Sequence, residues 1–405
     1  MSSLASAGGD SHAVESQLGR LDDREIAVVA EALEEAIKAS DRSIFYRAFR
    51  ASRLPFICHE YYDRPVELFA ACFDIVHRLG GVSPAVALAV ENHFYVTSAI
   101  ATFPAAADPA LERRRRRLIE TIATERLLVA NTNSKVHSVN IGEIGTLATR
   151  DGASLRVNGE AAYTSLASEA DLLILLTELK GEGAVFIEIP TQSENPSVEI
   201  GPYLFPNAML DSDTRRITFH DVRLPADALI AATQSRVTNS LVPFEMTWHQ
   251  LLIPALYLGA ALRAIEEVRS FLVATKGRDG QSLASLDGMV VDVGRLALEY
   301  QSARCLVHKA ADALADVQEI PRDEVQVERA VHLAGAAKYT GTRAAESIVT
   351  AARRVVGARS FVGNSVLERL SNEVMFASLG PEVSAVLERR YGKLVLENKF
   401  FQLLS

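Results

Sequence analysis

The sequence lacks several features that mark particular classes of protein. Its 405 residues include only three cysteines and one tryptophan, and the cysteines form no CxxC pair. Three scattered cysteines cannot build a disulfide framework, so the composition suits a reducing cytoplasm. No apolar run approaches the roughly 20 residues that a membrane-spanning helix needs. The sequence therefore predicts neither a disulfide-stapled secreted domain nor a membrane protein.

An excess of positive charge is also missing. The formal net charge is −9 at pH 7, which argues against nucleic acid as a partner. The one basic run, Arg113 to Arg117, follows Asp108-Pro109 and is interleaved with apolar residues. We expect a helix whose arginines face solvent, although an acidic carrier protein could use such a patch. Residues 1–21 are small and polar without an apolar segment, so we expect a disordered lead-in and no secretory signal.

The periodicity of apolar residues divides the remaining chain into three zones. Residues 22–129 and 236–405 follow the helical period, and the second of these zones carries long amphipathic runs. Residues 130–235 alternate over short distances and are rich in turn residues. We therefore predict a mostly helical protein with a central β-domain between two helical domains.

Two motifs stand out in the middle zone. Ser212 to Pro225 reads SDTRRITFHDVRLP, which predicts a strand that ends in a turn at Pro225. Asp151 to Ala170 reads DGASLRVNGEAAYTSLASEA, with a predicted turn at Asn158-Gly159 because Asn-Gly between alternating apolar residues favours a hairpin. Together the two motifs resemble the β-domain of the acyl-CoA dehydrogenase superfamily of flavoproteins. The order of helices, β-unit and helices is similar to that family over nearly the whole chain past residue 22.

The resemblance implies a fold and a cofactor. The expected fold has a helical N-terminal domain, a β-barrel-like middle domain and a C-terminal four-helix bundle. The expected cofactor is FAD, and no metal site is expected. The family's C-terminal arginine and glycine turn reach a flavin on a neighbouring subunit, so a homodimer or homotetramer is expected.

The resemblance also assigns residues to the flavin ring. Thr132 and Ser138 stand at the spacing of a Thr and a Ser in the family's "TEP-GSD" loop, whose Glu, Pro and Gly are absent here. Tyr163 and Ser165 match the family's aromatic-Ile-Thr/Ser step, in which the aromatic ring packs on the flavin and the hydroxyl addresses N5. An ordinary turn and an ordinary strand are the alternative interpretations.

Three further residues are assigned to the phosphate and adenosine end of the cofactor. Arg278 lies between two predicted long helices, where the family places an arginine. Arg354 and Gly357 lie where the family has its "Q-GG-G" turn, but only Gly357 of the paired glycines is present and Ala358 replaces the other. Arg354 and Arg359 would compensate electrostatically, or they are solvated arginines at a helix end.

Desaturation of an acyl thioester requires a base for the α-proton. In most of the family this base is a glutamate near the C-terminus, but Leu379 occupies its position here. A minority of the family carries the base on an earlier helix, ten residues before a glycine, and counting back from Gly259 gives His249. A histidine can act as a base near neutral pH. The alternative is a helix-borne histidine satisfied by a neighbouring side chain.

His93 suggests another chemistry. Flavin monooxygenases of the same fold often carry a histidine on an N-terminal helix above the flavin, and they need no α-proton base. The missing glutamate fits that branch, whereas the SDT strand resembles the dehydrogenases. For His93 alone, a packed core or surface histidine is the simpler interpretation.

These observations leave three functions open. The leading prediction is flavin-dependent α,β-dehydrogenation of an acyl thioester carried by CoA or a carrier protein, with an electron-transfer partner. The alternative is a two-component flavin monooxygenase that uses O₂ and reduced FMN or FAD supplied by a reductase. The third is a non-catalytic homologue kept for assembly or ligand binding.

Overall fold

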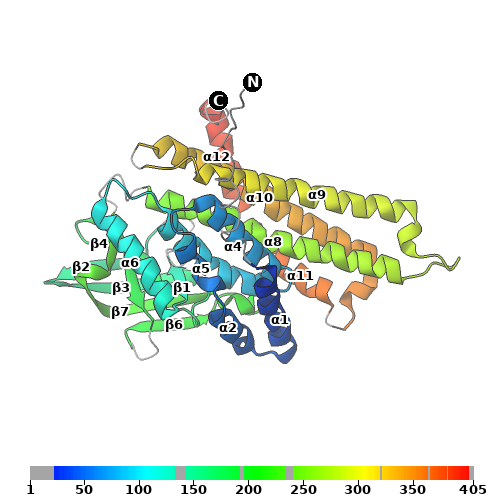
Figure 1. Cartoon of the computed structure of the whole chain (residues 1–405), viewed down its shortest axis with the longest axis horizontal. Coiled ribbons are helices and arrows are strands. Elements are labelled where there is room, and N and C mark those ends of the chain that lie inside the picture. Colours follow the sequence, from blue (N-terminus) through cyan, green and yellow to red (C-terminus); the bar gives the residue numbers. More distant parts are fainter. Residues whose placement is uncertain are drawn as a thin grey trace, which may run out of the picture.

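The computed structural model describes residues 22–132, 143–191, 196–232, 240–319, 322–363, 365–380 and 382–400. The predicted lead-in, residues 1–21, and the candidate Ser138 lie outside the described residues. Figure 1 shows N-terminal helices in the centre, a β-domain at one end and long C-terminal helices that extend toward the other end. The predicted fold class is confirmed.

The N-terminal helices enclose one central helix. They are α1 (Asp23–Ala39), α2 (Arg42–Ala51), α3 (Ile57–Glu60), α4 (Pro65–Gly80), α5 (Pro84–Thr102) and α6 (Pro109–Glu125). Ser83 caps α5 by accepting a hydrogen bond from the Val86 N–H, and Pro84 occupies the first turn. Nearly all of α5 is buried, because α4, α6, α8 and β1 pack around it. Its polar residues therefore face protein rather than solvent.

The β-domain is one mixed sheet. Its strands are β1 (Val129–Thr132), β2 (Thr146–Asp151), β3 (Ser154–Thr164), β4 (Leu172–Leu179), β5 (Gly183–Pro190), β6 (Val198–Tyr203), β7 (Arg215–Pro225) and β8 (Leu229–Ala232). The order is β6-β7-β3-β2-β4-β5-β8, and β1 pairs in parallel with β4. The sequence LLILLTEL of β4 is buried at every position but one, as expected for a central strand.

The predicted turn at Asn158-Gly159 is wrong. β3 runs through both residues, and the hairpin that joins it to β2 turns at Gly152. Gly159 instead follows a break in register against β7, with φ +118, and a Cβ there would lie 2.4 Å from the Gly145 carbonyl oxygen. The glycine thus serves a β-bulge, which needs the same backbone freedom as a turn.

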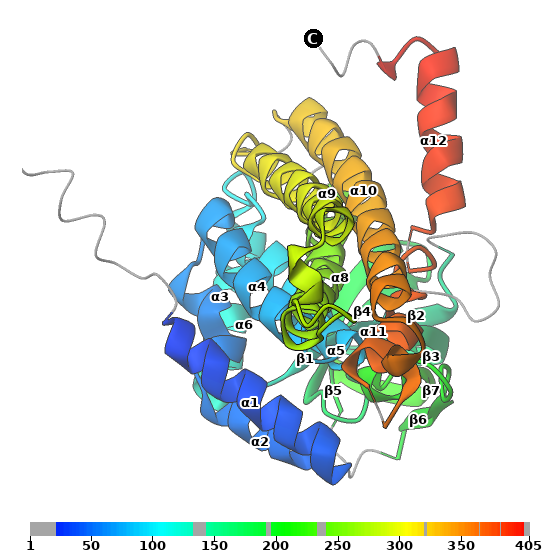
Figure 2. The ribbon, with the colours of Figure 1, turned by 90° about the vertical axis from the view of Figure 1, so that its right-hand side faces the viewer.

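The C-terminal part is built on three long helices. They are α8 (Leu241–Ala274), α9 (Asp287–Ala311) and α10 (Glu324–Val356), followed by the shorter α11 (Val366–Val374) and α12 (Ser384–Leu396). The three long helices pack side by side, whereas α12 stands away from the body of the molecule in Figure 2.

Glycines bring α4 and α8 into close contact. A Cβ on Gly259 would lie 1.9 Å from the His77 carbonyl oxygen, and one on Gly80 would lie 2.1 Å from that of Leu256. Any side chain at either position would push the helices apart. This close contact fixes where α8 sits along its axis relative to α4.

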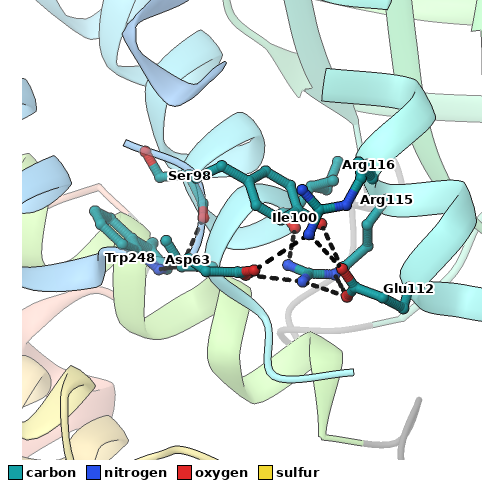
Figure 3. A network of polar contacts seen from close by, with 9 residues as sticks. Asp63, Ser98, Ile100, Glu112, Arg115, Arg116 and Trp248 are labelled. Atoms are coloured by element: carbon teal, nitrogen blue, oxygen red, sulfur yellow. Dashed lines mark hydrogen bonds and ion pairs between the residues drawn. The ribbon is translucent and has the colours of Figure 1, made fainter. Parts of the chain in front are cut away.

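The basic run on α6 is only partly solvated. The helix begins at Pro109 as expected, but Arg115 is buried. Its guanidinium forms ion pairs with Asp63 at 2.9 Å and Glu112 at 2.6 Å, and it donates a hydrogen bond to the Ile100 carbonyl. Figure 3 shows this network joining α6 to the end of α5. The expectation of a fully solvated arginine face is therefore wrong at Arg115, which ties two helices together.

Two absences hold for the described part of the chain. None of its helices is both long and apolar enough to cross a membrane. Within the same residues, no group of three or more His, Cys, Asp or Glu side chains is placed to hold a metal ion.

Candidate active site

A histidine–glutamate pair lies between α5 and α8. His249 Nδ1 is 3.0 Å from Glu91 Oε1, and the two side chains are 12% and 1% exposed. The Tyr95 ring lies 4.8 Å from the imidazole in an edge-on arrangement. His249 is thus neither a surface residue nor fully sealed in the core, since 12% of its side chain remains exposed.

A second buried carboxylate lies one helical turn earlier. Glu245 accepts a hydrogen bond from the Asn131 side-chain amide, and the Asn131 N–H donates to Asn92 Oδ1 at 2.6 Å. Burial raises the pKa of Tyr95 well above its ordinary value, and the charges of Glu245 and Glu91 add to the effect. The polar residues of α5, α8 and β1 therefore form one connected cluster.

The backbone around His249 is held by its neighbours. Trp248 is fully buried and donates from Nε1 to Thr102 Oγ1 at 3.1 Å. Gln250 donates from Nε2 to Glu382 Oε2 at 2.8 Å. Successive residues of a helix point about 100° apart, so three neighbouring side chains anchor α8 in three directions.

The ends of β1 and β3 bring two of the predicted flavin-ring residues next to this cluster. Thr132 follows Asn131 on β1, and it accepts a hydrogen bond of 2.6 Å from Thr164 Oγ1. Ser165 Oγ lies 2.9 Å from Thr214 Oγ1 of the SDT motif. The hydroxyl groups of Thr164 and Ser165 are therefore both engaged within the β-domain.

Tyr163 has the most unusual environment of the predicted residues. It lies in a bulge of β3 with φ +61, a conformation rare for a bulky residue, and half of its surface is exposed. Its ring stacks on Phe205 at 6.1 Å, and Phe205 contacts Phe376 at 4.9 Å. Strained, exposed aromatic residues on a bulge are typical of functional sites.

The segment that lacks the expected glutamate follows α11. Leu379 is 62% exposed and offers no titratable group. Glu382 instead binds Gln250 and pairs with Arg390 at 2.5 Å. Lys338 of α10 donates to the carbonyl oxygens of Gly380 and Glu382, and burial lowers its pKa to about 8. The carboxylate of Glu382 is therefore used by Gln250 and Arg390, and it does not contact His249.

A small apolar cavity of about 10 Å³ adjoins the cluster. Its lining residues come from α5, the sheet and α8: Val96, Ala99, Ile100, Ile174, Phe186, Ile230, Leu241 and Glu245. Glu245 is the one charged residue among them, so the polar cluster reaches an apolar space between the sheet and the helices.

His93 has a different environment from the one expected of a catalyst. The Val129 N–H donates to His93 Nδ1 at 2.9 Å, so Nε2 carries the hydrogen and donates to the Pro55 carbonyl at 2.6 Å. Burial lowers its pKa to about 4. Both ring nitrogens are used, which makes His93 a neutral link between α5, β1 and the turn at Pro55. This geometry contradicts a catalytic role for His93 and fits the simpler interpretation.

The residues predicted for the phosphate end lie elsewhere. Arg278 is exposed in the turn between α8 and α9, and Arg354 is exposed in the last turn of α10. Gly357 caps α10 with φ 68 and ψ −149, a conformation open essentially to glycine alone. In Figure 1 these turns lie at the end of the long helices away from the β-domain. One chain therefore does not bring Arg278, Arg354 and Gly357 to Tyr163.

The sequence did not predict Glu91, Tyr95, Asn131 or Glu245 as members of the site. Each carries no local motif, and each meets its partners only through the packing of α5, α8 and β1. A carboxylate within a run as apolar as PAVALAVENHFYV was the one available signal, because such a charge is rarely buried without a purpose.

Comparison with known proteins agrees with this architecture. The family model "Acyl-CoA dehydrogenase, C-terminal domain" matches residues 244–381. The putative acyl-CoA dehydrogenase YdbM of Bacillus subtilis is 26% identical over 242 residues, which cover 58% of this chain and 58% of YdbM.

Two solved structures share nearly the whole fold. FMN-bound TdsC from Paenibacillus sp. A11-2 has a TM-score of 0.77 at 18% identity, covering 93% of this chain and 97% of that one. Butyryl-CoA dehydrogenase from Megasphaera elsdenii has a TM-score of 0.75 at 15% identity, covering 93% and 99%. The helices and sheet thus form an acyl-CoA dehydrogenase fold. Residues 244–381 thus match an acyl-CoA dehydrogenase domain family, and the relatives by sequence and by fold support a place in the acyl-CoA dehydrogenase superfamily.

Proposed function

We propose that this chain is a flavin-dependent oxidoreductase that desaturates an acyl thioester, with His249 as the base for the α-proton. The observation that carries the proposal is the environment of His249. Its Nδ1 is bound to a buried carboxylate and its side chain is 12% exposed, while Glu245, one helical turn earlier, contacts Asn131 of β1 and lines an apolar cavity. Leu379 offers no base in the usual place.

The residues around Tyr163 fit a flavin ring. An isoalloxazine needs an apolar surface for its face and hydrogen-bonding groups at its pyrimidine edge. The exposed ring of Tyr163 supplies such a surface, and the hydroxyl groups of Thr132 and Ser165 each keep a hydrogen-bonding position beyond their contacts with Thr164 and Thr214. A bound flavin would supply the acceptor for the hydride of the substrate β-carbon. TdsC binds FMN, and we propose FAD or FMN for this chain.

The proton-transfer step follows from the residues themselves. When Nδ1 donates to Glu91, the lone pair of His249 is left on Nε2. That nitrogen takes the α-proton, and Glu91 stabilises the positive charge that develops on the ring. The lining of the small cavity beside Glu245 is otherwise apolar, which disfavours water at that point. These residues act at the α-carbon, so the same step serves a thioester of CoA or of a carrier protein.

The replacement of His249 by alanine tests the proposal. We expect His249→Ala to bind flavin normally but to lose proton exchange at the α-carbon of saturated acyl-CoA thioesters by about two to four orders of magnitude. Exchange is measured in D₂O by mass spectrometry. His220→Ala is the control, because His220 lies exposed on β7 and pairs only with Glu199 among the described residues. Near-normal exchange in His249→Ala would refute the assignment.

A second candidate function is monooxygenation. The absence of a glutamate at Leu379 favours it, and so does the similarity to TdsC, which is a dibenzothiophene monooxygenase. This candidate needs no α-proton base, so it predicts no α-proton exchange and a dependence on O₂ and added reduced flavin.

A further inference from the structure

We infer that Glu91 is the positioning residue of this site: it fixes His249 in the Nδ1–H tautomer and stabilises the imidazolium. The inference rests on the proposed function for its catalytic consequence. The tautomer of His249 can, however, be measured without flavin or substrate.

In the contact between His249 Nδ1 and Glu91 Oε1, the shared proton can belong to the imidazole or to the carboxyl group. An ionised carboxylate only accepts hydrogen bonds, so an ionised Glu91 requires His249 Nδ1 to donate across the 3.0 Å contact. Nε2 then keeps its lone pair. If Glu91 were protonated instead, it would donate to Nδ1, and the hydrogen of a neutral ring would move to Nε2. Only the first arrangement leaves a basic lone pair on the ring nitrogen that does not contact Glu91.

The surroundings of Glu91 explain why its charge depends on His249. Burial raises the pKa of Glu91, and the charge and hydrogen bond of His249 lower it. Glu91 Oε2 is buried and has no hydrogen-bond partner among the described residues. The titratable groups that feel its charge are Cys72 on α4, Tyr95 on α5 and Tyr257 on α8, none of which is a cation.

A buried carboxylate with one partner contributes little to folding. Burying an ion is costly, and a neutral side chain of the same size would fill the position more cheaply. Charges retained in such positions mark functional sites more often than structural ones. Among the described residues, the hydrogen-bond partner of Glu91 is His249, whose basicity the reaction needs, and Trp248 and Gln250 hold the backbone of His249 in place.

The tautomer is tested by ¹⁵N NMR of the flavin-free protein labelled at histidine. The chain has nine histidines, and the spectrum of His249→Gln identifies the signals of His249. We expect a protonated Nδ1 and an unprotonated Nε2 in the neutral ring. Glu91→Gln and Glu91→Ala should both weaken this preference, and Glu91→Ala more strongly. Glu373→Gln is the matched control, because Glu373 is also buried and bonded to the start of α5.

The same variants test the catalytic consequence. Glu91→Gln should slow α-proton exchange by about ten- to a hundredfold, less than the loss of the base itself, and should alter the dependence of exchange on pH. A hydrogen on Nε2 in the wild type, or an unchanged tautomer and pH profile in both Glu91 variants, would overturn the inference. The outcome is separable from the proposed function. If His249→Ala kept its activity, the function would fail while the tautomer measurement still decided the role of Glu91.

Discussion

Glu373 illustrates at the scale of one side chain how burial creates a pH dependence. It is buried, and its Oε2 accepts hydrogen bonds from Ser83 Oγ and the Ala85 N–H. Burial raises its pKa from 4.5 to about 7. Between these values the unfolded chain loses the proton while the folded chain keeps it, so the free energy of unfolding falls as pH rises. At about 1.4 kcal/mol per pKa unit, the effect reaches roughly 3 kcal/mol above pH 7.

Glu373→Gln should remove this dependence, because the amide oxygen still accepts both hydrogen bonds and carries no charge. We expect the variant to gain stability over the wild type by roughly 3 kcal/mol between pH 4.5 and pH 7.5. Urea unfolding at several pH values measures the difference. A difference between the two proteins that stays constant across this range would contradict the account.

Single residues also mark the limit of what the sequence predicts. The spacing to Gly259 drew attention to His249, because a ten-residue interval on one helix is visible in the sequence. Its partner Glu91 lies 158 positions away, and the packing of two helices decides the contact. His93 shows a second limit, because its surroundings cannot be predicted from its place on a helix. Its position on an N-terminal helix suggested a catalytic role. Both of its ring nitrogens instead bind backbone groups, at β1 and in the turn at Pro55.

At the scale of elements, the helix α6 combines two kinds of arginine in one run. Arg115 is buried in its network, whereas Arg113 is exposed and forms no hydrogen bond or ion pair with another described residue. Periodicity predicted the helix and its apolar face, but it could not tell which arginine turns inward. Asp63, the partner of Arg115, comes from the loop before α4.

The two arginines make a matched pair of variants. Arg115→Ala should lower the free energy of unfolding by about 2–4 kcal/mol, because it leaves the Ile100 carbonyl without its donor and leaves Asp63 and Glu112 with only their contacts to Arg116 and Tyr62. Arg113→Ala should change it by less than about 0.5 kcal/mol, as for an ordinary surface position. Chemical denaturation of both variants checks the difference. If Arg115→Ala changed the free energy of unfolding as little as Arg113→Ala, the network of Arg115 would add no stability.

The β-domain shows why local signals mislead about elements. Asn-Gly predicts a turn because a tight turn needs positive φ, but a bulge needs it too. The sequence marked Gly159 as special, and only the pairing of β3 with β2 and β7 decides its use. The same bulged strand exposes Tyr163, whose assignment to the flavin ring stays a prediction.

At the scale of the whole molecule, the candidate flavin residues fall into two groups. Tyr163 and its neighbours lie in the β-domain, whereas Arg278 and Gly357 lie at the far end of the long helices (Figure 1). That far end exposes apolar side chains, among them Phe361 at 57% and Val362 at 71%. We predict a homodimer or homotetramer in which this end meets the β-domain of a second copy.

Light scattering of the flavin-loaded protein tests the assembly. The expected mass is two or four times that of the chain. Phe361→Ser together with Val362→Ser should shift the mass toward that of the single chain and weaken flavin binding. A wild-type protein that binds flavin fully at the mass of one chain would contradict the shared site.

The most direct test of the central claim is anaerobic reduction of the bound flavin by an acyl-CoA thioester. The protein is purified, loaded with FAD or FMN and mixed with saturated acyl-CoA thioesters in the absence of O₂, while the visible flavin absorbance is followed. A desaturase predicts bleaching of the flavin and formation of the α,β-unsaturated thioester, with both lost in His249→Ala. No bleaching with any thioester, together with turnover that requires O₂ and pre-reduced flavin, would contradict the account and favour the monooxygenase.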